Sequence, residues 1–203
     1  MMRLLAGAIA LICSQSADAL SIRFEFPGAV QSSAAVARIE IERAEQVATP
    51  AGQSCGTRYR AKVVEGFKGI PTGGHIEFGY SSGRAVGAQY FVFLRATAGL
   101  APASAASGRT LMTGPVPYIA DCRDLLPPYV ETAEGMGTIP IRPGEHVSNE
   151  PAVTFGDPMY AIPANLPGAY WHLGHVVDGR LVGSVQISAV DFSTYLRTLL
   201  ASP

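Results

Sequence analysis

The sequence has few cysteines, and this scarcity limits the chemistry that thiols could perform. Only Cys13, Cys55 and Cys122 occur among 203 residues. Redox-active pairs usually take the C-x-x-C form, and a structural zinc site needs four ligands. The chain has neither pattern, so a redox centre and thiolate metal binding are both disfavoured.

Charged residues are also sparse, and the two signs nearly balance. They make up 15% of the chain, and the formal net charge is −1. Nothing in this balance favours nucleic acid or an anionic membrane surface as a partner. Lys62 and Lys68 are the only lysines. The preference for arginine, together with abundant alanine, is typical of bacterial chains with GC-rich coding.

Recognisable catalytic motifs are missing from the sequence. There is no G-x-S-x-G nucleophile turn, and the glycine-rich segment 69–74 fits neither the Walker nor the dinucleotide-binding pattern. We therefore expect a non-enzymatic protein without a cofactor. Four acidic residues could still converge as paired carboxylates, although exposed loop positions are the default interpretation: Asp121, Asp124, Glu131 and Glu134.

The N-terminus contains the three parts of an export signal. Arg3 precedes an uncharged apolar run over residues 4–13, and an A-x-A cleavage motif ends at Ala19. We predict a signal peptide over residues 1–19, cleavage between Ala19 and Leu20, and a secreted or periplasmic mature protein. Its partner would be an unidentified protein or a component of the cell envelope.

Two forms of membrane attachment are disfavoured by the N-terminal sequence. Lipid attachment at Cys13 is disfavoured because Ile12 stands where that signal requires a small side chain. The apolar run is too short for a retained helix, and no later segment is long enough to cross a bilayer. We therefore expect no stable membrane insertion once the signal is removed.

Two cysteines remain after the signal is removed, and we predict that Cys55 and Cys122 form a disulfide. An exported bacterial protein meets an oxidising compartment, where an even pair is most simply a single bridge. The remaining chain, residues 20–203, is about 184 residues long, which suits one domain with a sizeable core.

Four strands are predicted before residue 100. Segments 35–45, 58–67 and 75–80 alternate apolar and polar residues, which is the period of a half-buried strand. Segment 89–95 is a nearly continuous apolar run, typical of a strand covered on both faces. Glycine-rich turns at this spacing favour a barrel or a sandwich.

The second half of the chain is predicted to be less regular. Segment 110–122 could hold one more strand, and prolines and glycines limit 125–167 to irregular backbone with short strands at 138–141 and 152–155. Order should return with a hairpin of strands 170–177 and 180–187 around an Asp-Gly turn.

A helix is predicted to close the chain. Ser188 and Asp191 stand at capping-box spacing at its start. Five apolar residues could then form one stripe on the helix: Val190, Tyr195, Leu196, Leu199 and Leu200.

Two strand segments resemble the netrin-like superfamily, which includes the tissue inhibitors of metalloproteinases. They read YRAKVVEGFKG at 59–69 and GAQYFVFL at 87–94, and they are similar to the bacterial secreted members. The resemblance implies an OB-fold-like antiparallel barrel over 35–122. Together with the strand and helix patterns, it leads us to predict a mainly β fold in which a loop-rich extension over 123–203 carries the C-terminal hairpin and α-helix. The inhibitors act through a cysteine at the mature N-terminus. Leu20 occupies that position here, so this mechanism is not carried over.

Histidines offer a weaker candidate site. His172 and His175 lie close in sequence, with His146 as a further ligand if a loop folds back. Positions three apart on a strand face opposite ways, so two ordinary strand histidines are the favoured interpretation. A metal-dependent enzyme using these three residues remains a minor alternative.

Aromatic residues in the proline-rich half supply a candidate binding surface. Loops over a rigid barrel often carry binding residues, and the candidates here are Tyr118, Tyr129, Tyr160 and Trp171. The favoured structural explanation is that such aromatics fold inward and cover one end of the barrel. The leading functional hypothesis is an exported binding or interaction module. A secreted hydrolase inhibitor that acts by loop insertion is the first alternative.

Overall fold

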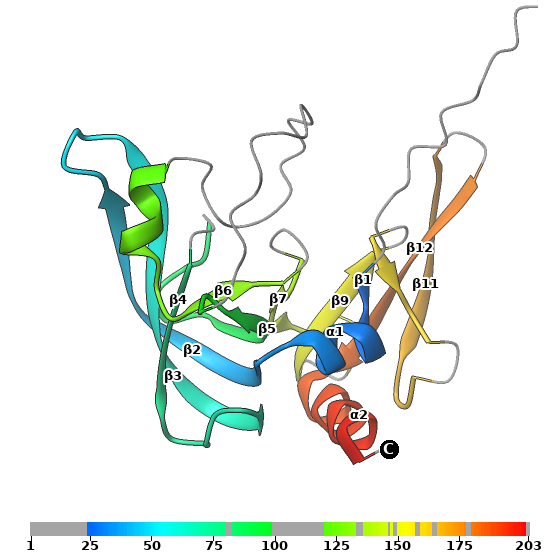
Figure 1. The fold of residues 1–203 in the computed structure, drawn as a ribbon. Helices are drawn as coiled ribbons and strands as arrows, with labels where there is room; N and C mark the ends of the chain where they lie inside the picture. The colour runs from blue at the N-terminus through cyan, green and yellow to red at the C-terminus, as the bar shows by residue number, and fades with distance from the viewer. Residues whose placement is uncertain are drawn as a thin grey trace, which may run out of the picture.

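The computed structural model describes residues 24–79, 83–98, 120–132, 136–145, 147, 150–156, 159–163, 166–177 and 180–201. The predicted signal peptide, its cleavage site at Ala19 and Leu20, and Tyr118 lie outside these ranges. The described chain is mainly β, as predicted, with sheets of six, four and two strands and a C-terminal helix (Figure 1).

The larger sheet contains the four strands predicted in the first half of the chain. Its members are β2 (Ala35–Ala48), β3 (Ser54–Lys68), β4 (His75–Gly79), β5 (Gln89–Ala96), β6 (Tyr129–Glu131) and β7 (Thr138–Pro140). They follow the order β2-β3-β4-β6-β5-β7, and β2 also pairs with β5. Five strands therefore form a cycle of neighbours, in which β4 and β6 are parallel. β6 and β7 lie beyond residue 122, so this sheet extends past the predicted core.

Strand β5 is covered on both faces, which confirms its prediction. Alternate residues point to opposite sides of a strand. Tyr90, Val92 and Leu94 face the first core, which is enclosed by the six-stranded sheet. Phe91 and Phe93 face a second core on the other side. The continuous apolar run thus reflects two cores that share one strand.

The smaller sheet comes from the second half of the chain. It consists of β8 (Arg142–Pro143), β9 (Pro151–Gly156), β11 (Tyr170–Val177) and β12 (Arg180–Ser188), in the antiparallel order β11-β12-β9-β8. The short strand predicted at 152–155 and the C-terminal hairpin are both confirmed. The Asp-Gly turn between β11 and β12 lies outside the described residues.

Several short elements were not anticipated. The described part of the chain begins with β1 (Phe24–Glu25) and α1 (Phe26–Ser32), and β1 pairs in parallel with β10 (Tyr160–Ala161). A 3₁₀ helix, η2 (Ala120–Leu125), replaces the described end of the strand predicted at 110–122. That part of the prediction was wrong, and the aspartates of ADCRDL explain it because aspartate is depleted in strands.

Helix α2 (Ala189–Ala201) begins as predicted. The Asp191 N–H donates to Ser188 Oγ at 3.0 Å, and the Ser188 hydroxyl donates to Asp191 Oδ2 at 2.8 Å. The predicted stripe was wrong at Val190, which is 65% exposed. Phe192 is buried instead, because positions 192, 195, 196 and 199 follow the spacing of one helix face.

Aromatic rings fill the second core, which lies between the two sheets and the two helices. Phe26 of α1 packs with its ring centroid 5.0 Å from that of Phe155 and 5.4 Å from that of Phe192. Phe24 lies 5.2 Å from Phe93. Side chains from α1, both sheets and α2 therefore meet in one cluster.

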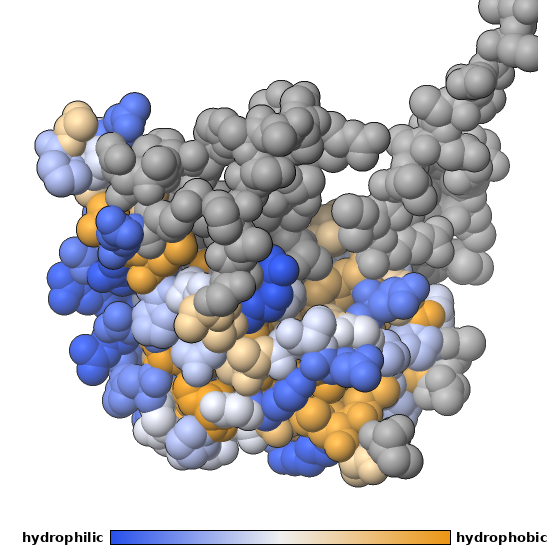
Figure 2. All heavy atoms as spheres, viewed as in Figure 1, coloured by the Kyte–Doolittle hydropathy of each residue, from blue (hydrophilic) through white to orange (hydrophobic). Residues whose placement is uncertain are grey.

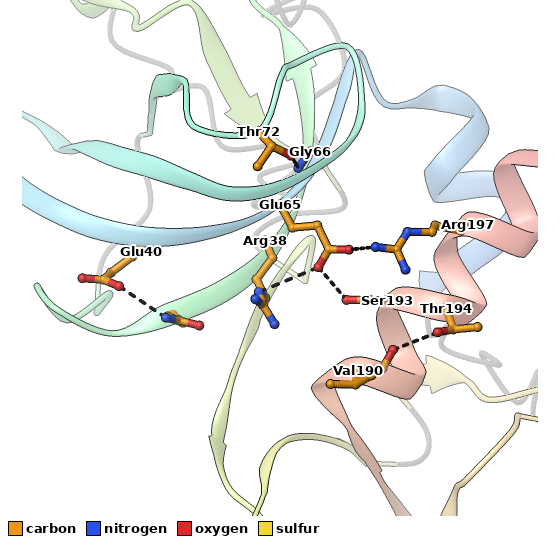
Figure 3. Close-up of polar contacts among 10 residues, drawn as sticks. Arg38, Glu40, Glu65, Gly66, Thr72, Val190, Ser193, Thr194 and Arg197 are labelled. Carbon is orange, nitrogen blue, oxygen red and sulfur yellow. Dashed lines mark hydrogen bonds and ion pairs between the residues drawn. The ribbon is translucent and has the colours of Figure 1, made fainter.

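A polar cluster also attaches α2 to the six-stranded sheet (Figure 3). The Ser193 hydroxyl of α2 donates to Glu65 Oε2 at 3.0 Å, and Arg197 binds the other carboxylate oxygen. Arg38 of β2 lies 3.9 Å from Glu65 on the sheet side. The Glu65 carboxylate is therefore paired with a positive side chain from the neighbouring strand and with one from the helix.

Candidate functional site

A groove of about 480 Å³ lies where the chain passes from the larger sheet to the smaller one. Pro140 ends β7 and Arg142 begins β8, so a single residue separates the two sheets. The groove is lined by Pro140, Arg142, Pro143, Glu145, Ala152, Thr154, Ser184 and Gln186. Ligand sites often occur at such junctions.

The period of the strands explains why this surface is polar. Val153 and Phe155 of β9 and Val185 and Ile187 of β12 are buried in the second core. Residues between them must face the other way. Thr154, Ser184 and Gln186 are consequently presented on the outer face of the smaller sheet.

Strand register arranges some of these side chains in a row. Gln186 lies opposite Thr154 on one side and Tyr170 on the other. The Gln186 side-chain amide donates to Thr154 Oγ1 at 3.3 Å. The row thus supplies an amide, a hydroxyl and a half-exposed phenol ring across three strands.

Two opposite charges stand beside this row. Arg142 and Glu145 are both exposed and line the same groove. A guanidinium offers several donors in a fixed plane, whereas a carboxylate only accepts hydrogen bonds. The groove can therefore bind a polar ligand that presents both donors and acceptors.

A buried ion pair forms a second feature, within the larger sheet. Glu131 of β6 is fully buried, and the Arg84 side chain is 19% exposed. Arg84 donates from Nη2 to Glu131 Oε2 at 3.1 Å and from Nε to Oε1 at 3.4 Å. A buried carboxylate requires such compensation.

The same charges act on Tyr160. Burial raises the pKa of the Tyr160 phenol above its ordinary value of 10.0; Arg84 opposes this rise and Glu131 adds to it. The phenol donates to the Met136 carbonyl at 3.3 Å. Tyr160 is therefore a neutral donor at physiological pH.

Two tyrosines of the first core hold the loop that carries Arg84. The Arg84 N–H donates to Tyr59 Oη at 3.3 Å, and the Ala85 N–H donates to Tyr90 Oη at 2.9 Å. Both rings are buried, so their hydroxyls fix the loop from inside the sheet. This anchoring sets the position of the guanidinium.

The predicted aromatic surface does not form one described site. Tyr129 packs against the first core, and Tyr160 packs against the second core. Trp171 is 50% exposed on the outer strand β11. Tyr160 follows the favoured interpretation of inward packing, because its ring contacts those of Phe24, Phe26 and Phe155.

No metal centre is found among the residues that the structure describes. Within them, no group of three or more histidine, cysteine, aspartate or glutamate side chains is placed to hold an ion. His172 and His175 lie in β11, but the positions of their side chains are not described. His146 lies outside the described residues.

The predicted disulfide is confirmed. Cys55 of β3 and Cys122 of η2 are joined, with their Cα atoms 5.6 Å apart. The bond is buried beside Val47, Leu125 and Leu126. It ties the second strand of the larger sheet to the segment that leads into β6.

The surface of the described chain is mixed in character. Figure 2 shows hydrophilic residues gathered over the side formed by β2 and β3, and hydrophobic residues at the surface near α1 and α2. No helix in the described ranges combines the length and apolarity needed to cross a membrane.

Known proteins offer no guide to the function. No family model matches the chain, no curated protein matches its sequence, and no solved structure matches its fold.

Sequence reasoning named Glu131 only as one of four carboxylates with exposed loop positions as the default, and this was wrong, because Glu131 is fully buried in β6. Arg84, Thr154 and Gln186 were not anticipated. Arg84 and Glu131 are 47 positions apart in sequence, so no local pattern links them. Gln186 and Thr154 belong to different parts of the chain as well. The available signal was the position of Tyr129 two residues before Glu131, since a strand over 129–131 places both side chains on the same face and Tyr129 packs against the first core.

Proposed function

We propose that this protein is an exported, non-enzymatic binding module that holds a polar partner in the groove of the smaller sheet. The observation that carries the proposal is the lining of that groove, which combines Arg142, Thr154 and Gln186 of the smaller sheet with Glu145 of the turn that follows β8. Preformed concave sites with a few fixed polar groups are typical of ligand binding.

The scaffold of this module is proposed to be an OB-fold-like barrel of the netrin-like kind. A cycle of five paired strands supports this assignment, because the OB fold is a five-stranded, partly open barrel. The two segments that carry the family resemblance, 59–69 and 87–94, belong largely to β3 and β5. The groove lies outside this cycle, in the extension.

Export is supported by two features. The disulfide suits a protein that matures in an oxidising compartment. The N-terminal sequence carries the signal pattern. The proposed partner is therefore a polar component of the envelope or the medium.

Affinity capture with a charge-reversal variant tests the proposal. The purified protein would be immobilised and exposed to envelope and culture-medium fractions of its host. Arg142→Glu should lose the captured component because it reverses a charge of the groove. Arg43→Glu is the matched control, since Arg43 is 71% exposed on β2 and does not line the groove. Equal capture by wild type and Arg142→Glu would overturn the assignment of this site.

Two further measurements separate the alternative functions. Inhibition of a secreted protease by the pure protein would instead support an inhibitor that acts by loop insertion. Stoichiometric zinc, copper or iron in elemental analysis would support a metal-dependent enzyme that uses His146, His172 and His175.

A further inference from the structure

A second pocket, of about 300 Å³, lies between α1 and the end of β5. Its apolar side is formed by Phe24, Gly28 and Ala29, and its polar side includes Glu25, Arg95 and Thr132. It shares no lining residue with the groove of the smaller sheet. The two sites are therefore independent.

The alternation of β5 predicts an apolar side chain at the position that Arg95 occupies. Phe91, Phe93 and Arg95 follow one another on the same face of β5, and the two phenylalanines are buried in the second core. The row ends at α1, where Arg95 lines the pocket beside Phe24. A charged group thus stands at the end of an aromatic row.

The Arg95 side chain has no hydrogen-bond or ion-pair partner in the described part of the chain. Its Nε atom is buried without an acceptor. Glu25 lines the same pocket, yet no ion pair joins it to Arg95. Arginine remains charged at all physiological pH values, and a buried donor without an acceptor is unfavourable. The pocket therefore contains a guanidinium with which no carboxylate of the described residues forms an ion pair.

The remaining polar groups do not supply a competing donor. The Thr132 hydroxyl donates to the Phe93 carbonyl at 3.0 Å, and the Ser32 hydroxyl donates to the Gly28 carbonyl at 2.8 Å. Arg95 is consequently the donor that remains for an anionic ligand. Glu25 places a negative charge on the same wall, which disfavours a ligand with two negative charges.

We propose that this pocket binds a small organic monocarboxylate with an apolar body. The guanidinium of Arg95 would accept the carboxylate in the planar, two-bond geometry that these groups favour. The apolar body would lie against Phe24 and Ala29, in the space that Gly28 leaves open. Nothing lies within 4 Å of a side-chain carbon added at Gly28.

Titration of the isotope-labelled protein with benzoate, followed by NMR, tests this site. Benzoate should shift the amide signals of α1 and the end of β5 in a saturable manner. Benzyl alcohol has the same ring without the charge, and phthalate has a second carboxylate. Each should bind about tenfold more weakly or worse, because each loses or opposes the charged hydrogen bonds. Equal affinity for benzoate and benzyl alcohol would overturn the role of Arg95.

Two variants and one control complete the test. Arg95→Gln should lower benzoate affinity about tenfold or more, since it removes the charge. Gly28→Leu should block the pocket while keeping Arg95, so it tests the site even if the first variant is unstable. Arg43→Gln, at an exposed arginine that lines neither pocket, should bind benzoate like the wild type. Absence of saturable shifts at millimolar benzoate, or unchanged binding by both pocket variants, would refute the proposal.

Discussion

Removing Arg84 should destabilise the fold strongly, because it takes the guanidinium away from a carboxylate that water cannot reach. Glu131 is fully buried, and two hydrogen bonds of 3.1 and 3.4 Å join it to Arg84. Breaking a buried pair by removing one partner typically costs about 3–5 kcal/mol. Since Arg84 is 19% exposed, water can partly replace it, and we expect Arg84→Met to lose about 3 kcal/mol.

A double-mutant cycle separates the interaction between Arg84 and Glu131 from the other effects of each substitution. Glu131→Gln should cost about 1–2 kcal/mol, because Arg84 can then turn toward solvent while the amide keeps an acceptor. The double variant Arg84→Met/Glu131→Gln should lose less than the sum of the two single changes. A coupling energy of about 1–2 kcal/mol is expected for residues in direct contact.

Urea unfolding at fixed pH and salt measures these free energies. Arg43→Met is the matched control, because Arg43 lies 3.5 Å from Glu45 on an exposed surface. Exposed ion pairs contribute about 0–1 kcal/mol, so this control should change stability little. A loss below about 1 kcal/mol for Arg84→Met, or equal losses for both arginines, would refute the assignment of a buried, mutually compensating pair.

Three further predictions concern other parts of the fold. Replacing both Cys55 and Cys122 with alanine should lower the free energy of unfolding by about 4 kcal/mol, since 67 positions separate them; a loss below about 1 kcal/mol in urea unfolding would contradict this. Gly28→Ala should raise the free energy of unfolding by about 0.5–1 kcal/mol, because Gly28 is helical and has open space around it. Gly69→Ala should lower the free energy of unfolding, because Gly69 has a φ of +69°. The raised pKa of Tyr160 means that the folded state keeps this proton above pH 10.0 while the unfolded chain loses it. The free energy of unfolding should therefore fall as pH rises beyond that value. It should fall less steeply with pH for Tyr160→Phe, as measured by urea unfolding at a series of pH values.

Local patterns predicted the elements whose causes are local. The strand over 89–95 was identified because an uninterrupted apolar run requires cover on both faces. The start of α2 followed from the spacing of Ser188 and Asp191, whose mutual hydrogen bonds are present. The disulfide followed from the cysteine count and the export signal. Each of these depends on residues that are adjacent or on whole-chain composition.

Elements stabilised by distant contacts could not be predicted in this way. Helix α1 has seven residues and includes a proline and a glycine, so its own propensity is poor. It exists because Phe26 and Val30 are buried in the second core. The pairing of Arg84 with Glu131 likewise needs β6 to lie beside β5, and β6 is too short to carry a strand signal of its own.

Both proposed ligand sites are formed largely by elements that also supply side chains to the second core, and the Phe26 side chain contacts several of these elements. The Phe26 ring contacts Phe93 of the larger sheet, Phe155 of the smaller sheet and Phe192 of α2, with ring centroids 5.0–6.2 Å apart. Interiors packed in this way are close to solid density, so a displaced ring is felt by all its neighbours. The groove contains residues from β7, β8, β9 and β12, and the Arg95 pocket contains residues from β1, α1 and β5. Both sets of elements are held at the distances set by this aromatic core, so the specificity of each site depends on how α1 is seated between the sheets.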